Sequence, residues 1–147
     1  MVSKIPPAER EALLASPLIG VLSVAAEPGR APLTTPIWHR YTPGGEVTVE
    51  TSPNTRKFKL IEAAGRFALC VQDRATIRYV TVEGPVTGMH PITEEERLAM
   101  ARNYLPEEAA IAYLKATPRQ SANIVITMRP ERWNTADYSD VVSGEPS

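Results

Sequence analysis

The sequence has few of the side chains from which metal sites and disulfides are built. It contains one cysteine, Cys70, and two histidines, His39 and His90. One cysteine cannot form an internal disulfide, and Cys70 lies in the apolar run 67–71, where we expect a buried strand residue rather than a catalytic thiol. Neither histidine has a cysteine or carboxylate at metal-ligand spacing, so the sequence predicts no metal site.

The sequence also has little net charge and no long apolar runs. The net charge is −1, from 16 basic and 17 acidic residues, which gives no general attraction to nucleic acid or to acidic membranes. No run approaches the length of a membrane span, and the polar segment 1–10 lacks the apolar stretch of a secretory signal. We therefore expect a cytoplasmic protein. A chain of 147 residues with 43% apolar content fits a single domain over 1–147.

Several catalytic motifs are missing as well. The chain has no glycine-rich phosphate loop of the dinucleotide or nucleoside-triphosphate type, and no serine stands in a nucleophile elbow. Hydrolysis and nucleoside-triphosphate chemistry therefore lose support. The glutamates at 94–96 and 107–108 lie at predicted helix starts, where the helix dipole already explains them.

Hydrophobic periodicity predicts a mainly β protein with peripheral helices. We expect helices over about 7–15, 53–64, 94–104 and 106–117, and strands over 19–26, 31–41, 46–51, 66–71, 78–88 and, as the last strand, 121–128. Because several strands are linked by hairpins and βαβ alternation is absent, a small antiparallel barrel fits better than a parallel sheet. Thr93 and Glu96 form a predicted capping box, and the tail over about 139–147 has little to bury, so it is expected to be flexible.

The junction between the third predicted strand and the helix after it is typical of a phosphate site. Ser52 or Asn54 can cap the helix, and Pro53 suits its first turn. Free N–H groups at a helix start favour an anion, and Arg56 and Lys57 add two full charges there. The alternative is that these two cations form only a solvated helix face. Cations at a helix start oppose the dipole, which costs a little stability unless an anion is present.

Two motifs and their order resemble the flavin-binding split β-barrel family. They are the Thr51…Arg56-Lys57 junction and the strand Arg78–Gly84, and the likeness covers about 16–138. The family includes pyridoxamine 5′-phosphate oxidases and deazaflavin-dependent (coenzyme F-420) reductases. The resemblance implies a homodimeric split β-barrel with two cofactors bound across the subunit interface.

The resemblance also implies a set of cofactor-binding residues. By the family pattern these are Thr35, Pro36, Ile37, Trp38, Thr51, Ser52, Arg56, Lys57, Tyr79 and Trp133. Arg56 and Lys57 would hold the cofactor phosphate, and the strand over 35–38 would lie against the ring. Each aromatic residue also has a structural interpretation: Trp38 and Tyr79 can pack the barrel, and Trp133 can anchor a dimer interface. His39 and Arg40 alternate along a strand, so only one of them can face the site.

Departures from the family pattern bear on the substrate. Pyridoxamine phosphate oxidases carry an arginine at the position of Thr35 and an Arg-x-His pair near the C-terminus, which 134–138 does not supply. Tyr79 replaces a glutamine that contacts the flavin, and this favours F-420 over FMN. The expected activity is hydride transfer between reduced F-420 or FMN and a small unsaturated or aromatic acceptor, without a covalent catalyst. The rival hypotheses are a non-enzymatic flavin- or haem-binding carrier and a dimerising barrel with an empty site.

Overall fold

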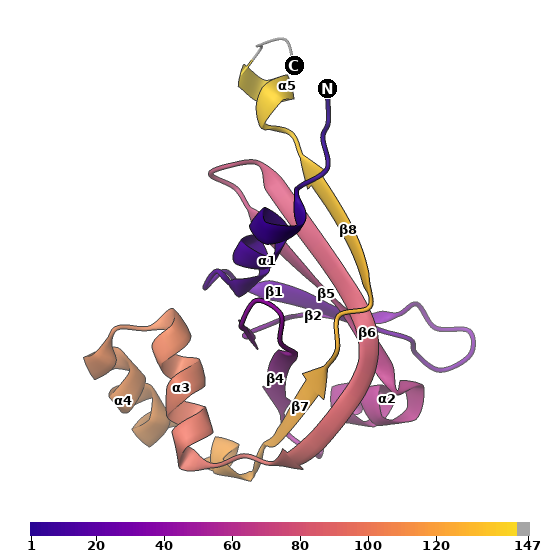
Figure 1. Cartoon of the computed structure of the whole chain (residues 1–147). Helices are drawn as coiled ribbons and strands as arrows, with labels where there is room; N and C mark the ends of the chain where they lie inside the picture. Colours follow the sequence, from indigo (N-terminus) through magenta and orange to yellow (C-terminus); the bar gives the residue numbers. More distant parts are fainter. Residues whose placement is uncertain (144–147) are drawn as a thin grey trace.

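The computed structural model describes residues 1–143, which form eight strands, five α-helices and one short 3-10 helix (Figure 1). The helices are α1 (Pro7–Ala15), α2 (Arg56–Ala64), α3 (Glu94–Tyr104), α4 (Glu107–Ala116) and α5 (Ser139–Ser143), and η1 spans Pro118–Ala122. The strands are β1 (Gly20–Val24), β2 (Leu33–Ile37), β3 (Arg40–Tyr41), β4 (Val47–Thr51), β5 (Arg66–Asp73), β6 (Arg78–Pro91), β7 (Ile124–Met128) and β8 (Arg132–Asp137). No helix within this range is long and apolar enough to cross a membrane.

All strand pairs are antiparallel, and the long strand β6 belongs to two sheets. The strand order is β2-β1-β5-β6-β7-β4-β3, and β8 pairs with the first half of β6. Figure 1 shows β6 running along the molecule, with β8 beside one half and β7 beside the other. The strands twist around this shared strand, so the sheet curves and one of its faces encloses the core. The predicted mainly β architecture with peripheral helices is confirmed.

The change of partner along β6 takes place at Gly84. The connection from β7 to β8 crosses the strand there: the N–H of Arg129 donates to the Pro85 carbonyl at 3.0 Å, and the N–H of Glu131 donates to the Glu83 carbonyl at 2.9 Å. A Cβ atom on Gly84 would lie 1.7 Å from the Arg129 carbonyl oxygen. The glycine of the Val-Glu-Gly strand is therefore required because another backbone segment occupies the place of its side chain.

The core follows the alternation of the strands. Side chains at every second position face inward, among them Leu22 and Val24 of β1, Val47 and Val49 of β4, and Val80 and Val82 of β6. The leading helix α1 adds Leu13 and Leu14. Cys70 lies on the other face of β5 and is only half-buried, so the expected burial of its thiol was wrong in degree.

Several predicted boundaries needed correction. The segment over 31–41 is two strands, because the chain leaves the first sheet at Trp38-His39 and β3 joins the second sheet beside β4. The segment over 121–128 begins within η1, and the last strand is β8, which the sequence analysis missed. The capping box of α3 is present with Thr93 and Glu96 in the predicted roles. Part of the predicted flexible tail forms α5, and residues 144–147 lie outside the described residues.

His39 belongs to the core and Arg40 to the surface. The His39 side chain is 1% exposed, and its Nε2 donates to the Leu14 carbonyl at 2.7 Å. Burial lowers the pKa of His39, so the imidazole is neutral. The hydroxyl of Tyr104 accepts the backbone N–H of His39 at 2.9 Å, which ties α3 to the turn between β2 and β3.

Replacing Gly84 should destabilise the place where the two sheets join. We expect Gly84→Ala to lower the free energy of unfolding by about 3 kcal/mol, because the new methyl group collides with backbone rather than with a side chain that can move. Gly88→Ala is the matched control on the same strand, since its Cβ would lie 3.2 Å from the hydroxyl of Thr127 and should cost less than about 1 kcal/mol. Urea unfolding measures both variants, and equal midpoints would contradict this role of Gly84.

Candidate functional site

A cavity of about 420 Å³ opens between the end of β2, the start of α2 and the segment from α4 through η1. Its lining combines apolar, aromatic and charged side chains: Ile19, Pro36, Ile37, Trp38, Glu50, Lys57, Tyr113, Gln120 and Asn123. Four residues of the predicted cofactor set, Pro36, Ile37, Trp38 and Lys57, thus come together from two elements. The size and the mixed lining suit a small-molecule ligand.

Lys57 is the cation of this cavity. It occupies the first turn of α2, and burial lowers the pKa of its ammonium group. Within residues 1–143 it has no ion pair or hydrogen bond, and the backbone N–H groups of Arg56 and Lys57 find no acceptor. The first turn of α2 also contains no acidic residue. The helix start therefore presents unmatched positive charge, which an anion would balance.

The cap of α2 differs from the predicted one. Thr55 is the N-cap, and its Oγ1 accepts the N–H of Phe58 at 3.2 Å, so neither Ser52 nor Asn54 caps the helix and Pro53 precedes it. The Thr51 side chain is buried and lies 3.3 Å from that cap oxygen. Ser52 is half-buried in the turn, where its carbonyl accepts the Thr55 hydroxyl at 2.8 Å. Thr51 and Ser52 thus shape the helix start beside Lys57 without lining the cavity.

Arg56 points to a different neighbour. Its guanidinium donates three hydrogen bonds to the carboxylate of Glu27, in the turn between β1 and β2, and the shortest is 2.6 Å. This contact lowers the pKa of Glu27 to about 2. Both side chains are exposed, and Arg56 does not line the cavity. Of these two cations, Lys57 lines the cavity and has no ion pair within residues 1–143, whereas Arg56 is paired with Glu27.

Trp38 forms the aromatic wall, together with residues from the α3–α4 hairpin. Its indole stacks on the Tyr104 ring, with ring centroids 4.9 Å apart and an interplanar angle of 10°. The centroid of the Tyr113 ring lies 5.2 Å from that of Trp38. Trp38 thus packs against the hairpin and also lines the cavity. Thr35, the remaining residue of this segment, is half-buried, and its hydroxyl donates to the Pro36 carbonyl at 3.3 Å.

Glu50 is the carboxylate of the cavity, and the sequence analysis did not identify it. It lies on β4 between the inward-facing Val49 and Thr51, so its side chain leaves the opposite face of the sheet. Burial raises the pKa of Glu50 to about 7, while the positive charges of Arg97 and Arg40 partly oppose this shift. A carboxyl that titrates near neutrality inside a cavity is common at functional sites.

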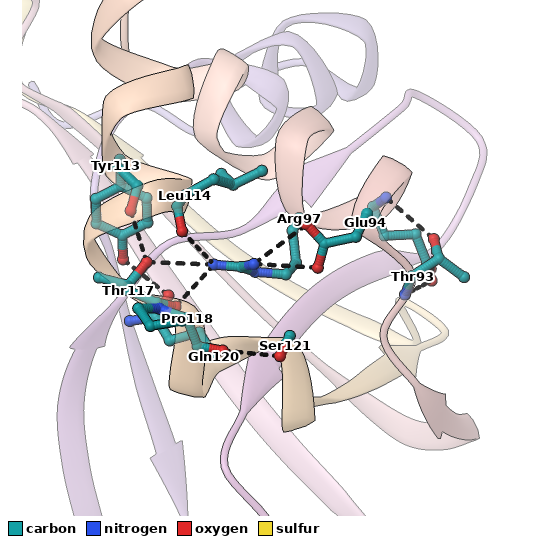
Figure 2. A network of polar contacts seen from close by, with 10 residues as sticks. Thr93, Glu94, Arg97, Tyr113, Leu114, Thr117, Pro118, Gln120 and Ser121 are labelled. Carbon is teal, nitrogen blue, oxygen red and sulfur yellow. Dashed lines mark hydrogen bonds and ion pairs between the residues drawn. The ribbon is translucent and has the colours of Figure 1, made fainter.

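Arg97 joins the helices on one side of the cavity, and Figure 2 shows its polar contacts. Its side chain is 5% exposed; one nitrogen pairs with Glu94 at 3.1 Å, and the other donates to the carbonyls of Leu114 and Thr117 at 3.3 and 2.8 Å. These carbonyls end α4, so a single guanidinium joins α3 to the turn that leads into η1. Tyr113 and Gln120 line the cavity from either side of this turn, and the Tyr113 hydroxyl donates to the side-chain amide oxygen Oε1 of Gln120 at 3.1 Å.

Two predicted site residues lie elsewhere. Tyr79 on β6 lines a separate cavity with Tyr138, and the two rings are 6.3 Å apart. Trp133 on β8 packs against the guanidinium of Arg10, whose Cζ lies 4.4 Å from the centroid of the Trp133 ring. Trp133 also contacts Tyr41 edge-on, with ring centroids 6.2 Å apart. Neither side chain lines the cavity that holds Lys57. Within one copy of residues 1–143, the structure therefore brings together only part of the predicted set.

The cavity residues that were not predicted have no local pattern in the sequence that would mark them as site residues. Glu50 alternates with valines, which is the ordinary pattern of a solvent-facing strand residue, but it is half-buried in a cavity whose other walls come from distant segments. Tyr113, Gln120 and Asn123 come from a region without a recognisable motif. No group of three or more possible metal-ligating side chains is found in the described part of the chain.

Comparisons with known proteins show which known fold this chain shares. No family model and no curated protein matches the sequence. Among solved structures, an F420 reductase is similar with a TM-score of 0.61 and 23% identity over 84% of this chain and 94% of that one. An FAD-binding protein from Mesorhizobium loti has a TM-score of 0.63 and 17% identity over 93% of this chain and 98% of that one.

A third structure comes from Clostridium acetobutylicum and is related to general stress protein 26, of the pyridoxinephosphate oxidase family. Its TM-score is 0.63, with 13% identity over 90% of this chain and 89% of that one. Likeness at these identities shows the fold. The chain adopts the antiparallel split β-barrel that the sequence motifs predicted.

The charge of Glu50 should make stability depend on pH. Because the folded state raises its pKa, ionising Glu50 costs stability as the pH rises from its unfolded value near 4.5 to about 7. We expect Glu50→Gln to match the wild type at pH 5 and to be more stable by roughly 1–3 kcal/mol at pH 8. Urea unfolding at both pH values measures this, and a constant difference between the proteins would contradict it.

The Arg97 contacts should stabilise the helical hairpin. Arg97→Met leaves two partly buried carbonyls without this donor, so we expect a loss of about 1–3 kcal/mol and faster amide exchange in α4. Arg102→Met is the matched control on the same helix, because the Arg102–Glu107 pair is exposed and worth less than about 1 kcal/mol. Equal effects of the two substitutions would show that Arg97 does not hold the hairpin.

Proposed function

We propose that this chain is an oxidoreductase that uses a deazaflavin or flavin, coenzyme F-420 or FMN, bound in the cavity between β2, α2 and α4. The observation that carries the proposal is Lys57, which has no ion pair or hydrogen bond within residues 1–143 and faces the same cavity as the aromatic wall of Trp38 and Tyr113. A cation beside an aromatic wall suits a ligand that has both a phosphate and a flat ring. The names of the similar structures, an F420 reductase and an FAD-binding protein, favour the same class of cofactor.

The residues present fit such a cofactor. Lys57 and the free N–H groups at the start of α2 would hold the phosphate, with Thr51 and Ser52 shaping that turn. The segment from Thr35 to Trp38 would lie along the ring, with its backbone toward the ring's polar edge. When bound and reduced, the cofactor supplies a hydride for a small unsaturated or aromatic acceptor. The chain binds and orients the reactants and excludes water.

Arg56 would join the site by changing partners. Its guanidinium is held by Glu27 in the unliganded arrangement, and both side chains are exposed. An exposed pair of this kind is worth little, so a phosphate can compete for Arg56. We propose Arg56 as a second phosphate ligand that is released from Glu27 when the phosphate binds.

A homodimer accounts for the residues that one chain leaves apart. Tyr79 and Trp133 do not line the cavity with Lys57, whereas the resemblance implies that some cofactor contacts come from the partner subunit. We propose that a second copy completes the site with one or both of these side chains. The cavity of one chain is open, which leaves room for such a contribution.

Lys57 should dominate the binding of the cofactor. We expect Lys57→Ala to weaken the binding of FMN or F-420 by roughly 10- to 100-fold, the range of a charge-assisted contact in a partly buried site. Arg56→Ala should have a smaller effect, because breaking the Arg56–Glu27 ion pair offsets part of the free energy that Arg56 gains by contacting the phosphate. Lys59→Ala is the control, since Lys59 is an exposed cation on the same helix. Flavin and deazaflavin fluorescence titrations measure the affinities, and unchanged affinity in Lys57→Ala would sink the phosphate assignment.

Turnover separates the enzyme from a carrier. Reduced F-420 and reduced FMN are each mixed with the protein and with a panel of quinones, nitroaromatic compounds and conjugated enones. Oxidation of the cofactor at a rate that depends on the protein supports the reductase. A protein that binds the cofactor tightly and accelerates none of these reactions would instead be a carrier.

A further inference from the structure

Glu50 and Lys57 face one cavity and are not paired with each other. Neither side chain forms a hydrogen bond or an ion pair within residues 1–143. Glu50 comes from β4 and Lys57 from α2, so the fold brings a carboxylate and an ammonium to the same space from separate elements. A site that binds anions gains nothing from an ionised carboxylate, which makes the presence of Glu50 informative.

The other charges near Glu50 do not neutralise it. Arg97 and Glu96 approach from α3 and Arg40 from β3, and their charges act on Glu50 in opposing directions. Arg97 is already engaged by Glu94 and by two carbonyls, while Glu96 is held by Thr93 and His90. Burial is the largest influence, and with a pKa of about 7 Glu50 is divided between its two protonation states at neutral pH.

We propose that Glu50 takes up a proton when the cavity binds a phosphorylated flavin or deazaflavin, and that this uptake makes cofactor affinity depend on pH. The inference rests on the proposed function, because it assigns the anionic ligand to this cavity. A phosphate near Lys57 and an ionised Glu50 repel each other in a partly dehydrated space. Protonation removes this repulsion and gives the carboxyl an O–H donor for a polar atom of the ligand.

The protonation equilibrium sets the size of the effect. Above pH 7 the free protein is increasingly ionised at Glu50, so binding must draw one proton from solvent. Affinity for FMN should therefore fall by up to about tenfold per pH unit between pH 7 and 8.5. Riboflavin has the same ring system without the phosphate, so its affinity should fall less steeply.

Two variants isolate the carboxyl group. Glu50→Gln keeps the size of the side chain and remains neutral, so it should bind FMN with nearly constant affinity from pH 7 to 8.5 and more tightly than the wild type at pH 8.5. Glu50→Asp keeps an ionisable group and should keep a pH-dependent affinity. Glu62→Gln is the control, because Glu62 is an exposed carboxylate on α2.

The test combines fluorescence titrations of FMN, F-420 and riboflavin with calorimetry in two buffers of different ionisation heat. At pH 7 we expect the wild type to take up as much as about half a proton per FMN bound, and Glu50→Gln to take up none. Circular dichroism checks that each variant is folded. Equal pH dependence and equal proton uptake in the wild type and Glu50→Gln would overturn the role of Glu50 while leaving the proposed cofactor in place. Failure of the wild type to bind FMN or F-420 even at pH 6 would overturn both.

Discussion

The partner change of β6 at Gly84 is the constraint on which the rest of the structure depends. One strand serves two sheets only because the connection from β7 to β8 passes over it in contact with its backbone. This crossing sets where β7 lies, and β7 in turn holds β4, the strand that carries Glu50 and leads to the start of α2. The pairing of β6 with β7 and of β7 with β4 thus connects the close backbone contact at Gly84 to the strand that carries Glu50.

The cavity depends on a second, weaker attachment. The α3–α4 hairpin extends from the barrel in Figure 1, and its internal packing is secured by Arg97, as seen in Figure 2. Its contacts with the turn after β2 include the Tyr104 hydroxyl and the stack of Trp38 on Tyr104. Strand β4 and helix α2 therefore place the charged residues Glu50 and Lys57, whereas the aromatic wall depends on the contact of Trp38 with the hairpin. A ligand in the cavity would touch both parts and favour their present arrangement.

Features with local causes could be predicted from the sequence, and features with distant causes could not. The capping box of α3 needs only Thr93 and Glu96, and it is present. The cap of α2 was misplaced because Ser52, Asn54 and Thr55 are all good caps, and the fold of the preceding turn selects Thr55. Strand β8 was missed because its sequence, Arg-Trp-Asn-Thr-Ala-Asp, has little hydrophobic alternation and is stabilised by pairing with β6. The resemblance pointed to Lys57 and Trp38 but not to Glu50, whose cavity is built by segments far from it in the chain, among them those that carry Tyr113 and Gln120.

The central claim is that the cavity between β2, α2 and α4 is the cofactor site, and the structure of a complex tests it most directly. A crystal structure of the protein with FMN or F-420 should show the phosphate at Lys57 and the ring along the segment from Pro36 to Trp38. It should also show Tyr79 or Trp133 of a second copy near the ring. A cofactor found instead in the separate cavity of Tyr79 and Tyr138, with the Lys57 cavity holding only water, would contradict the account.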